Sequence, residues 1–564
     1  MDVDIGQGDM ISLVLPGIFH YLDRCRSRHA IHMKEGGTML YRHSGYLLVL
    51  LVLVFFAGAC GSPPMTTTVE VTGGTIEGVE QDSLFTFKGI PFAAPPVGDL
   101  RWKAPTPVEP WTGVKKADAF GPACMQASRS MGNTAPVSED CLYLNVWTPA
   151  KMQDEKLPVI YWIYGGGFRG GSTSTPMYDG THFAKKGVVM VSGAYRVGPF
   201  AFLAHPELSR ESGKGSGTYG LSDMIAGLEW VRENIHRFGG DPSNVTIFGH
   251  SAGGMAVNML AASPVASGLF HRAICMSGGS FAPLQTSDEA VTGLGIPSLK
   301  VAESDGEAFL EKLGVSDIKA ARALSSEEIQ NSLGSGMGGG GIRFRPVADG
   351  YVIPSDLYSI YQAGRFNDTP ILAGHTSNEL GGFGGPSKIT AAQFEEQIQS
   401  QYGPLADTIL SAYPHSTDAE AAKSSTEMSR DSMFGWSTWT WARLQSEKGT
   451  GKAYAYYYDH HAPDADGAGH GSDVPYAFQT LGGGPQGEPK PEDLELSDMI
   501  SSYWVNFAKT GDPNGSDLPE WPAFTENDQK VMVFDSEPGA RPVPNLEKLK
   551  AYDAYISWLR EQAE

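Results

Sequence analysis

The sequence predicts an α/β fold with a large, mostly parallel, twisted sheet flanked by helices, and three patterns lead to this prediction. Two apolar runs, 158–164 (PVIYWIY) and 188–192 (VVMVS), have the continuous hydrophobicity of strands buried in a parallel sheet. Residues 221–237 repeat apolar positions at helical spacing. Residues 244–254 (NVTIFGHSAGG) then join a strand-like run, a glycine turn and a helix-compatible segment. Alternating strands and helices of this kind form parallel sheets.

Further strand-like runs surround this central region. The segment 68–120 is strand-like and broken by turns. Shorter runs of the same kind occur at 142–147, 273–277, 370–374, 454–458 and 531–534. Because no long low-complexity linker divides the 564 residues, we expect residues 68–562 to form one domain with loop and helical insertions.

The N-terminal region has the pattern of an export signal. Residues 46–59 are a 14-residue apolar run, which is short for a membrane span and typical of a signal peptide. Gly58 and Ala59 directly precede Cys60, which resembles the cleavage box of bacterial lipoproteins, where the cysteine becomes lipid-modified. Cys60 is therefore the expected lipid anchor, with ordinary secretion or an uncleaved anchor as alternatives.

The same pattern fixes the expected boundaries. Residues 1–38 are too long and mixed for the start of a signal, so we interpret them as an extension. This favours Met33 or Met39 as the start and leaves Met1 as the alternative. Residues 39–60 are the signal and anchor, and 61–67 a linker. We expect a periplasmic or cell-surface lipoprotein, or alternatively a secreted protein.

Charge and composition exclude several classes of partner. The formal net charge of −22 argues against binding nucleic acid or anionic membranes, and simple solubility explains it. Cysteines and histidines show no metal-ligand spacing, so no metal and no cofactor are expected. Residues 334–341 (GSGMGGGG) lack the preceding strand and the Lys-Ser/Thr ending of a phosphate loop, which leaves a flexible loop.

The five cysteines divide by position. Cys25 lies upstream of the signal, Cys60 is the anchor candidate, and Cys275 lies in a buried strand-like run. Cys124 and Cys141 remain, and export makes a disulfide between them plausible, worth roughly 3 kcal/mol through loop closure. Two unpaired core thiols are the alternative.

Gly249-His250-Ser251-Ala252-Gly253 fits a nucleophile elbow, G-x-S-x-G between a strand and a helix. The turn is so sharp that a Cβ two positions before or after the serine would clash. It lifts the hydroxyl of Ser251 out of the sheet. A plain glycine turn is the alternative, and the flanking strand and helix favour the elbow.

A serine hydroxyl needs a neutral imidazole to take its proton, and a carboxylate to hold that imidazole. Strand 370–374 runs into HTSNELGGF, which offers Glu379 and no other nearby acid. After strand 454–458, GAGHGSDVPYAF places His470 between glycines. His460 and His461 are rivals nearer the strand end, whereas His250 points away from its neighbour Ser251. We predict the order Ser251, Glu379, His470.

Acyl transfer also needs donors for the oxyanion, each worth roughly 3 to 4 kcal/mol of barrier. Gly165-Gly166-Gly167 follows the buried strand 158–164 and leaves backbone N–H groups free to face a cleft. We expect Gly166, Gly167 and Ala252 to form the oxyanion hole. A hairpin turn is the alternative for the three glycines.

These motifs resemble the type-B carboxylesterases, an α/β-hydrolase family that includes bacterial para-nitrobenzyl esterases, cholinesterases and the non-catalytic neuroligins. The resemblance covers roughly residues 68–560. It rests on FKGIPFAAPPVGDLRW, SEDCLYLNVW, YWIYGGGF, NIHRFGGDPSNVTIFGHSAGG, FRPVADG, GHTSNELGGF, GHGSDVPYAF and SSYWVNFAKTGDPN in family order. It implies an α/β-hydrolase fold, the same triad and oxyanion hole, and a disulfide between Cys124 and Cys141.

Departures from the family narrow the expected activity. His250 stands where the family usually has Glu, and the loop from Cys124 to Cys141 lacks the Trp on which cholinesterases stack a quaternary ammonium. The glycine-rich segment before FRPVADG predicts a roomy or mobile acyl side. We therefore expect a serine carboxylesterase acting on uncharged esters. A neuroligin-like binding protein, or a lipase or peptidase, are the rival functions.

Overall fold

The computed structural model describes residues 63–127, 133, 135–287, 295–333, 343–379, 388–482 and 488–563. From Ser62 to Glu564 the chain forms one compact unit, separate from residues 1–61. The expected signal, the anchor at Cys60 and the loop 334–341 lie outside the described residues. The start codon and export therefore stay predictions.

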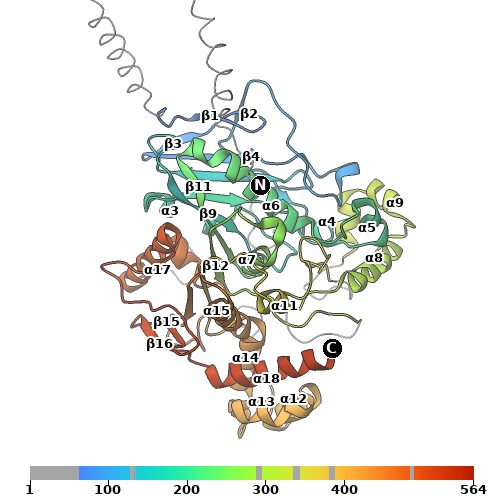
Figure 1. Cartoon of the computed structure of the whole chain (residues 1–564), viewed down its shortest axis with the longest axis vertical. Coiled ribbons are helices and arrows are strands. Elements are labelled where there is room, and N and C mark those ends of the chain that lie inside the picture. The colour runs from blue at the N-terminus through green and yellow to red at the C-terminus, as the bar shows by residue number, and fades with distance from the viewer. Residues whose placement is uncertain are drawn as a thin grey trace, which may run out of the picture. The chain divides into compact units, whose positions relative to one another are not determined.

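One large twisted sheet organises the described chain (Figure 1). It has eleven strands in the order β16-β15-β14-β13-β12-β11-β9-β10-β8-β4-β3. Its strands are β3 (Val79–Gln81), β4 (Leu84–Pro91), β8 (Tyr143–Thr148), β9 (Leu157–Ile163), β10 (Val189–Gly193), β11 (Gly240–His250), β12 (Arg272–Met276), β13 (Ile371–Thr376), β14 (Ala453–Tyr458), β15 (Lys530–Phe534) and β16 (Gly539–Pro542).

Six of the ten strand pairings, from β10 to β15, are parallel. The four antiparallel pairings lie towards the two edges. The sequence prediction of a mostly parallel sheet is confirmed, and its strand positions agree with the structure to within a few residues. A small second sheet holds β1 (Thr68–Val71), β2 (Gly74–Glu77) and β5 (Val114–Lys116), and β6 (Ala123–Cys124) pairs with β7 (Val137–Ser138).

Helices cover the sheet and fill the connections between its strands. They are α3 (Thr181–Lys185), α4 (Pro199–Phe202), α5 (Pro206–Ser212), α6 (Tyr219–Asn234), α7 (Ala252–Ala262), α8 (Leu299–Leu313), α9 (Ile318–Ala323), α10 (Ser326–Asn331), α11 (Leu357–Gln362), α12 (Ala391–Gln401), α13 (Ala406–Ala412), α14 (Asp418–Arg430), α15 (Trp436–Lys448), α16 (Val474–Phe478), α17 (Pro491–Thr510) and α18 (Leu546–Ala563).

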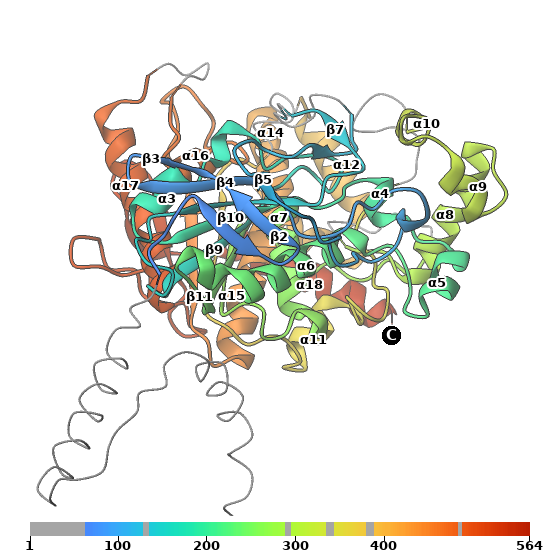
Figure 2. The same ribbon diagram turned by 90° about the horizontal axis from the view of Figure 1, so that it is seen from above.

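The helices form three groups. Helices α6, α7, α15 and α17 pack against the sheet. Helices α12, α13, α14 and α18 pack on one another below it in Figure 1. Helices α5, α8 and α9 lie together beyond α4 at one side, as Figure 2 shows from above. The sequence predicts helical insertions but does not say where they lie.

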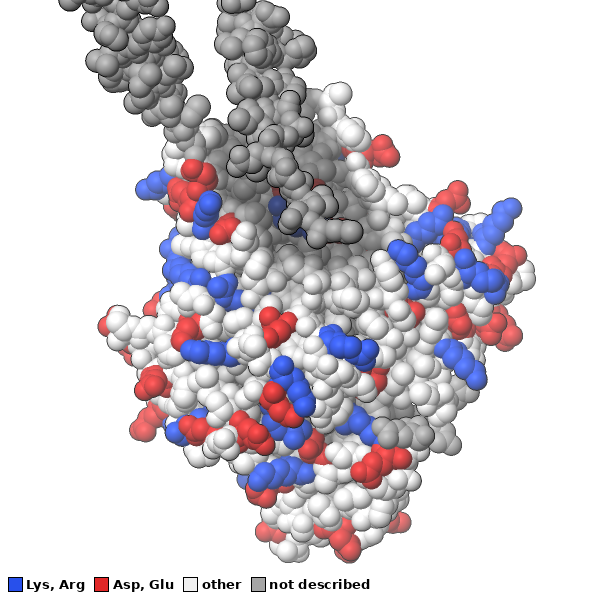
Figure 3. All heavy atoms as spheres, viewed as in Figure 1, with Lys and Arg blue, Asp and Glu red and all other residues white. Residues whose placement is uncertain are grey.

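Aromatic side chains form the core around β9 and β11. Trp162 on β9 contacts Phe248 on β11 and Phe478 on α16 with ring centroids 4.5 and 4.8 Å apart. Acidic and basic side chains are interspersed on the face that Figure 3 shows. Among the described residues, no helix combines the length and apolar character needed to cross a bilayer.

Cys124 and Cys141 form a disulfide, and the buried Cys275 is a free thiol. The alternative of two unpaired thiols at 124 and 141 is thereby excluded. The bridge joins Cys124 on β6 to Cys141, which lies two residues before β8, and so ties β6 to the main sheet.

Candidate active site

The nucleophile elbow lies where β11 ends and α7 begins. Ser251 is between them with φ 57° and ψ −124°, a conformation that L-residues rarely adopt. A Cβ at Gly249 would lie 2.4 Å from the backbone of Gly253, and one at Gly253 would lie 2.1 Å from the carbonyl oxygen of Ile163. Both glycines are therefore required for the turn, as the motif predicts.

Glu379 lies in the loop that follows β13 and is fully buried. Its Oε1 accepts hydrogen bonds from the Ser277 hydroxyl at 2.7 Å and the Thr376 amide at 2.8 Å. Burial alone raises the pKa of a carboxyl. The neighbouring His470, His375 and the Ser277 hydroxyl together outweigh burial, and they lower the pKa of Glu379 to about 2. The side chain is thus a carboxylate at neutral pH.

His470 lies in the loop after β14, beside the loop that carries Glu379. The Asn378 amide donates to the Ala468 carbonyl at 2.9 Å, and the Ala468 amide donates to the Ser377 hydroxyl at 2.8 Å. This pairing extends the β13–β14 ladder past the ends of the two strands. It fixes the imidazole next to the carboxylate.

The three predicted side chains form one hydrogen-bonded chain. His470 Nε2 lies 2.9 Å from Ser251 Oγ, and His470 Nδ1 lies 2.5 Å from Glu379 Oε2. Burial lowers the pKa of His470, but the Glu379 carboxylate raises it more. The pKa of His470 therefore lies above its usual value of 6.5. With Nδ1–H donated to Glu379, Nε2 faces the serine as the acceptor.

The glycine loop 165–167 approaches the elbow closely. A Cβ at Gly165 would lie 2.9 Å from the Cβ of Ser251. Gly166 and Gly167 have φ values of 127° and 61°, which favour glycine. Within the described part of the chain, the amides of Gly166, Gly167 and Ala252 donate to no acceptor. They are available to an oxygen atom bound beside Ser251.

The rival histidines have other partners than Ser251 and Glu379. His460 pairs with Asp493 at 2.7 Å, and His461 lies 3.5 Å from Asp459. The ring of His250 packs 4.6 Å from the ring of His470. Burial and then the nearby His470 hold the pKa of His250 well below 6.5, so this ring is neutral at neutral pH.

Three residues around the cluster were not predicted from the sequence. Ser277 donates to Glu379, Phe434 stacks on the His470 ring, and Asp473 is buried three residues after His470. Burial, partly offset by a hydrogen bond from Tyr456, raises the pKa of Asp473 to about 7. Asp473 lies in the motif GHGSDVPYAF beside His470, so the sequence held a signal for it. Ser277 and Phe434 have no such signal, because packing alone brings them to the site.

Comparison with known proteins places the chain in a family. The sequence profile of the Carboxylesterase family matches residues 65–552. The chain belongs to the carboxylesterase family. This carboxylesterase is 36% identical over 521 residues to the fumonisin B1 esterase of Sphingopyxis macrogoltabida. The alignment covers 86% of this chain and 91% of that relative. It is 35% identical to the para-nitrobenzyl esterase of Bacillus subtilis, over 84% of this chain and 96% of the relative.

Solved structures agree with the sequence relatives. A para-nitrobenzyl esterase structure superposes with a TM-score of 0.74 at 33% identity, covering 86% of this carboxylesterase and all of the other chain. The fold is therefore the α/β-hydrolase fold that the sequence predicts. Family and relatives together identify the protein as a carboxylic ester hydrolase.

Proposed function

We propose that this carboxylesterase hydrolyses uncharged carboxylic esters through an acyl-enzyme. Ser251 is the nucleophile, His470 is the general base and acid, and Glu379 is the carboxylate of the triad. The observation that carries the proposal is the continuous hydrogen-bonded chain from Glu379 through His470 to Ser251. A serine becomes a useful nucleophile at neutral pH when such an imidazole accepts its proton.

Acylation follows from this geometry. As Ser251 Oγ attacks the ester carbonyl carbon, its proton moves to His470 Nε2, and the imidazolium is paired with the Glu379 carboxylate. The carbonyl oxygen becomes an oxyanion, which accepts hydrogen bonds from the amides of Gly166, Gly167 and Ala252. His470 then gives the proton to the alkoxy oxygen, the C–O bond breaks, and the alcohol leaves.

Deacylation repeats these steps with water. His470 Nε2 takes a proton from a water molecule, whose oxygen attacks the acyl carbon. The same three amides hold the second oxyanion. The proton then returns to Ser251 Oγ as the acid leaves, which restores the resting enzyme without any cofactor.

The preference for uncharged substrates rests on the groups beside the nucleophile. His250 is neutral and stands where the family usually has a carboxylate. The sequence between Cys124 and Cys141 contains no Trp to stack on a quaternary ammonium. A neutral aryl ester is therefore expected to be a better substrate than a choline ester of the same acid.

The test is steady-state hydrolysis of a neutral short-chain aryl ester, followed by a panel that includes a para-nitrobenzyl ester, fumonisin B1, long-chain glycerides and peptides. Ser251→Ala and His470→Ala should each lower kcat by roughly 10⁴-fold or more. Wild-type turnover in both variants rules out the proposed roles. A binding protein without catalysis would show no turnover in the wild type either.

We also propose that the protein is exported and anchored by a lipid on Cys60, in the periplasm or at the cell surface. The apolar run 46–59 before Cys60 supports this proposal, and the Cys124–Cys141 disulfide fits an oxidising compartment. Intact mass of the membrane-extracted protein should show a chain beginning at Cys60 with added acyl mass. A secreted chain without this mass would contradict the anchor.

A further inference from the structure

Two other rings contact the imidazole of His470. Phe434 stacks on one side with centroids 5.0 Å apart and planes only 9° from parallel. His250 packs at 4.6 Å with a tilt of 38°. Phe434 is itself 4% exposed, so its ring is fixed by packing. The triad geometry accounts for neither neighbour.

An irregular turn of helix presents Phe434. Residues Asp431–Gly435 form η7, a π-helical turn between α14 and α15. π-helical turns are rare, interrupt the regular bonding of an α-helix and occur often at functional sites. A Cβ at Gly435 would lie 3.3 Å from His375 Nε2, so glycine there lets the turn sit close to β13.

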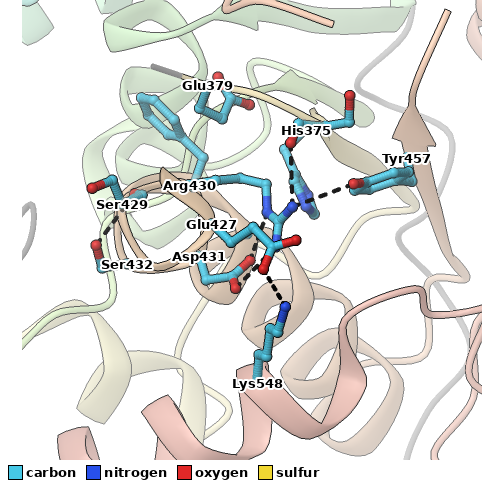
Figure 4. A network of polar contacts seen from close by, with 12 residues as sticks. His375, Glu379, Glu427, Ser429, Arg430, Asp431, Ser432, Tyr457 and Lys548 are labelled. Atoms are coloured by element: carbon cyan, nitrogen blue, oxygen red, sulfur yellow. Dashed lines mark hydrogen bonds and ion pairs between the residues drawn. The ribbon is translucent and has the colours of Figure 1, made fainter. Parts of the chain in front are cut away.

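A buried ion pair holds this turn against the loop of Glu379. The Arg430 guanidinium binds the Asp431 carboxylate through Nε at 2.8 Å and Nη2 at 3.0 Å, and its Nη1 donates to the Ser377 carbonyl at 3.2 Å. Figure 4 shows Arg430 between Asp431 and Tyr457, near Glu379. Arg430 thus connects the turn that carries Phe434 to the loop that carries the acid.

The charged and titratable groups near the imidazole come from several other elements. Glu379 faces it from the loop after β13, His250 from the end of β11, and Asp473 from the start of α16. His375 lowers the pKa of Glu379. Arg430 lowers the pKa of His375, and Asp431 raises it. A substitution at Phe434 leaves each of these groups in the chain.

We propose that Phe434 is a positioning residue, whose ring holds the His470 imidazole in line between Glu379 and Ser251 and stabilises its imidazolium form. The inference rests on the proposed function of His470. The face of an aromatic ring attracts a cation, and a desolvated contact does so more strongly. At a pH above its pKa, His470 is cationic only while a tetrahedral intermediate forms or decays, so the stack then favours the transition state over the resting enzyme.

The test compares three replacements at position 434. Phe434→Leu removes the ring, Phe434→Tyr keeps it, and pentafluorophenylalanine keeps the shape but reverses the charge of the ring face. The leucine and fluorinated variants should lower the pKa of His470 by about half a unit to one unit and lower kcat about three- to tenfold, with KM nearly unchanged. Phe434→Tyr should resemble the wild type.

Two readouts measure these effects. The acid limb of kcat/KM between pH 5 and 9 reports the His470 pKa in the free enzyme. Imidazole ¹⁵N NMR on the Ser251→Ala background reports the same pKa without turnover. Phe394→Leu is the matched control, because Phe394 is a buried phenylalanine on α12 whose ring lies 5.7 Å from that of His415, away from the triad.

A wild-type pKa in the fluorinated variant overturns the inference, and so does equal loss of activity in Phe434→Leu and Phe394→Leu. Failure of the leucine variant to fold leaves the isosteric fluorinated variant to decide. If the wild type hydrolyses no ester, the proposed function fails, while the NMR titration still decides whether Phe434 stabilises the imidazolium.

Discussion

At the scale of the residue, Glu379 shows how a buried charge is retained. Both of its oxygens have partners: Ser277 and the Thr376 amide bind one, and His470 binds the other. Removing a carboxylate from water is costly, and these donors offset that cost. The same contacts fix which nitrogen of His470 carries the proton in the resting state.

Replacing Glu379 with Gln tests this coupling through pH. In the wild type, kcat/KM should fall as pH drops through the His470 pKa, which lies above 6.5, because a protonated imidazole cannot accept the serine proton. Glu379→Gln should lower kcat roughly 10³- to 10⁴-fold and move the acid limb to lower pH, since the carboxylate no longer raises that pKa.

Glu492→Gln is the control for the same chemical change. The Glu492 side chain is 62% exposed on α17 and pairs only loosely with Lys490, at 3.8 Å. Its pH profile should match that of the wild type. A flat wild-type profile from pH 5 to 8, or an unchanged limb in Glu379→Gln, would be incompatible with the role of the carboxylate.

At the scale of the element, the elbow depends on the close approach of α7 to β9. Gly253→Ala would place a Cβ 2.1 Å from the Ile163 carbonyl oxygen. Backbone cannot yield as a flexible side chain can, so we expect a loss of roughly 1 to 3 kcal/mol in unfolding free energy and a severe loss of activity. Urea unfolding and aryl-ester turnover measure the two effects.

Gly539→Ala serves as the matched control on β16. Its Cβ would have no neighbour nearer than 4.0 Å, so stability and activity should stay close to wild type. Equal stability and activity in the two glycine variants would show that the elbow is not as tightly packed as the structure indicates.

The disulfide is a second element-scale feature with a measurable effect. Replacing Cys124 and Cys141 together with Ser should lower the unfolding free energy by roughly 3 kcal/mol, because the bridge restricts the unfolded chain. Reductant should destabilise the wild type by a similar amount and leave the double variant unchanged. Cys275 is a free thiol in both proteins and offers no bond to reduce, so an equal response to reductant would show that the effect does not come from the bridge.

The sequence was informative where the chemistry is local. Continuous apolar runs predict β9 and β10, and the glycine pattern predicts the elbow, because sterics within a few residues decide both. Phe434 has no such signal: its π-helical turn depends on the Arg430–Asp431 pair and on the approach to His375, which only the folded chain creates. Ser277 likewise reaches Glu379 across the 102 residues that separate them in the chain.

At the scale of the whole molecule, the parallel sheet brings distant residues together. Ser251, Glu379 and His470 follow β11, β13 and β14, and parallel strands end at the same edge of a sheet. Ser251 and His470 are 219 positions apart in the chain, yet Ser251 Oγ and His470 Nε2 lie only 2.9 Å apart.

Covalent labelling with a neutral aryl organophosphonate, mapped by peptide mass spectrometry, tests this convergence most directly. The probe reacts only with a serine whose proton is taken by a base beside it. We predict one phosphonyl group per chain, on Ser251, absent in Ser251→Ala and formed far more slowly in His470→Ala. Labelling of a different serine, or an undiminished rate in His470→Ala, would contradict the account.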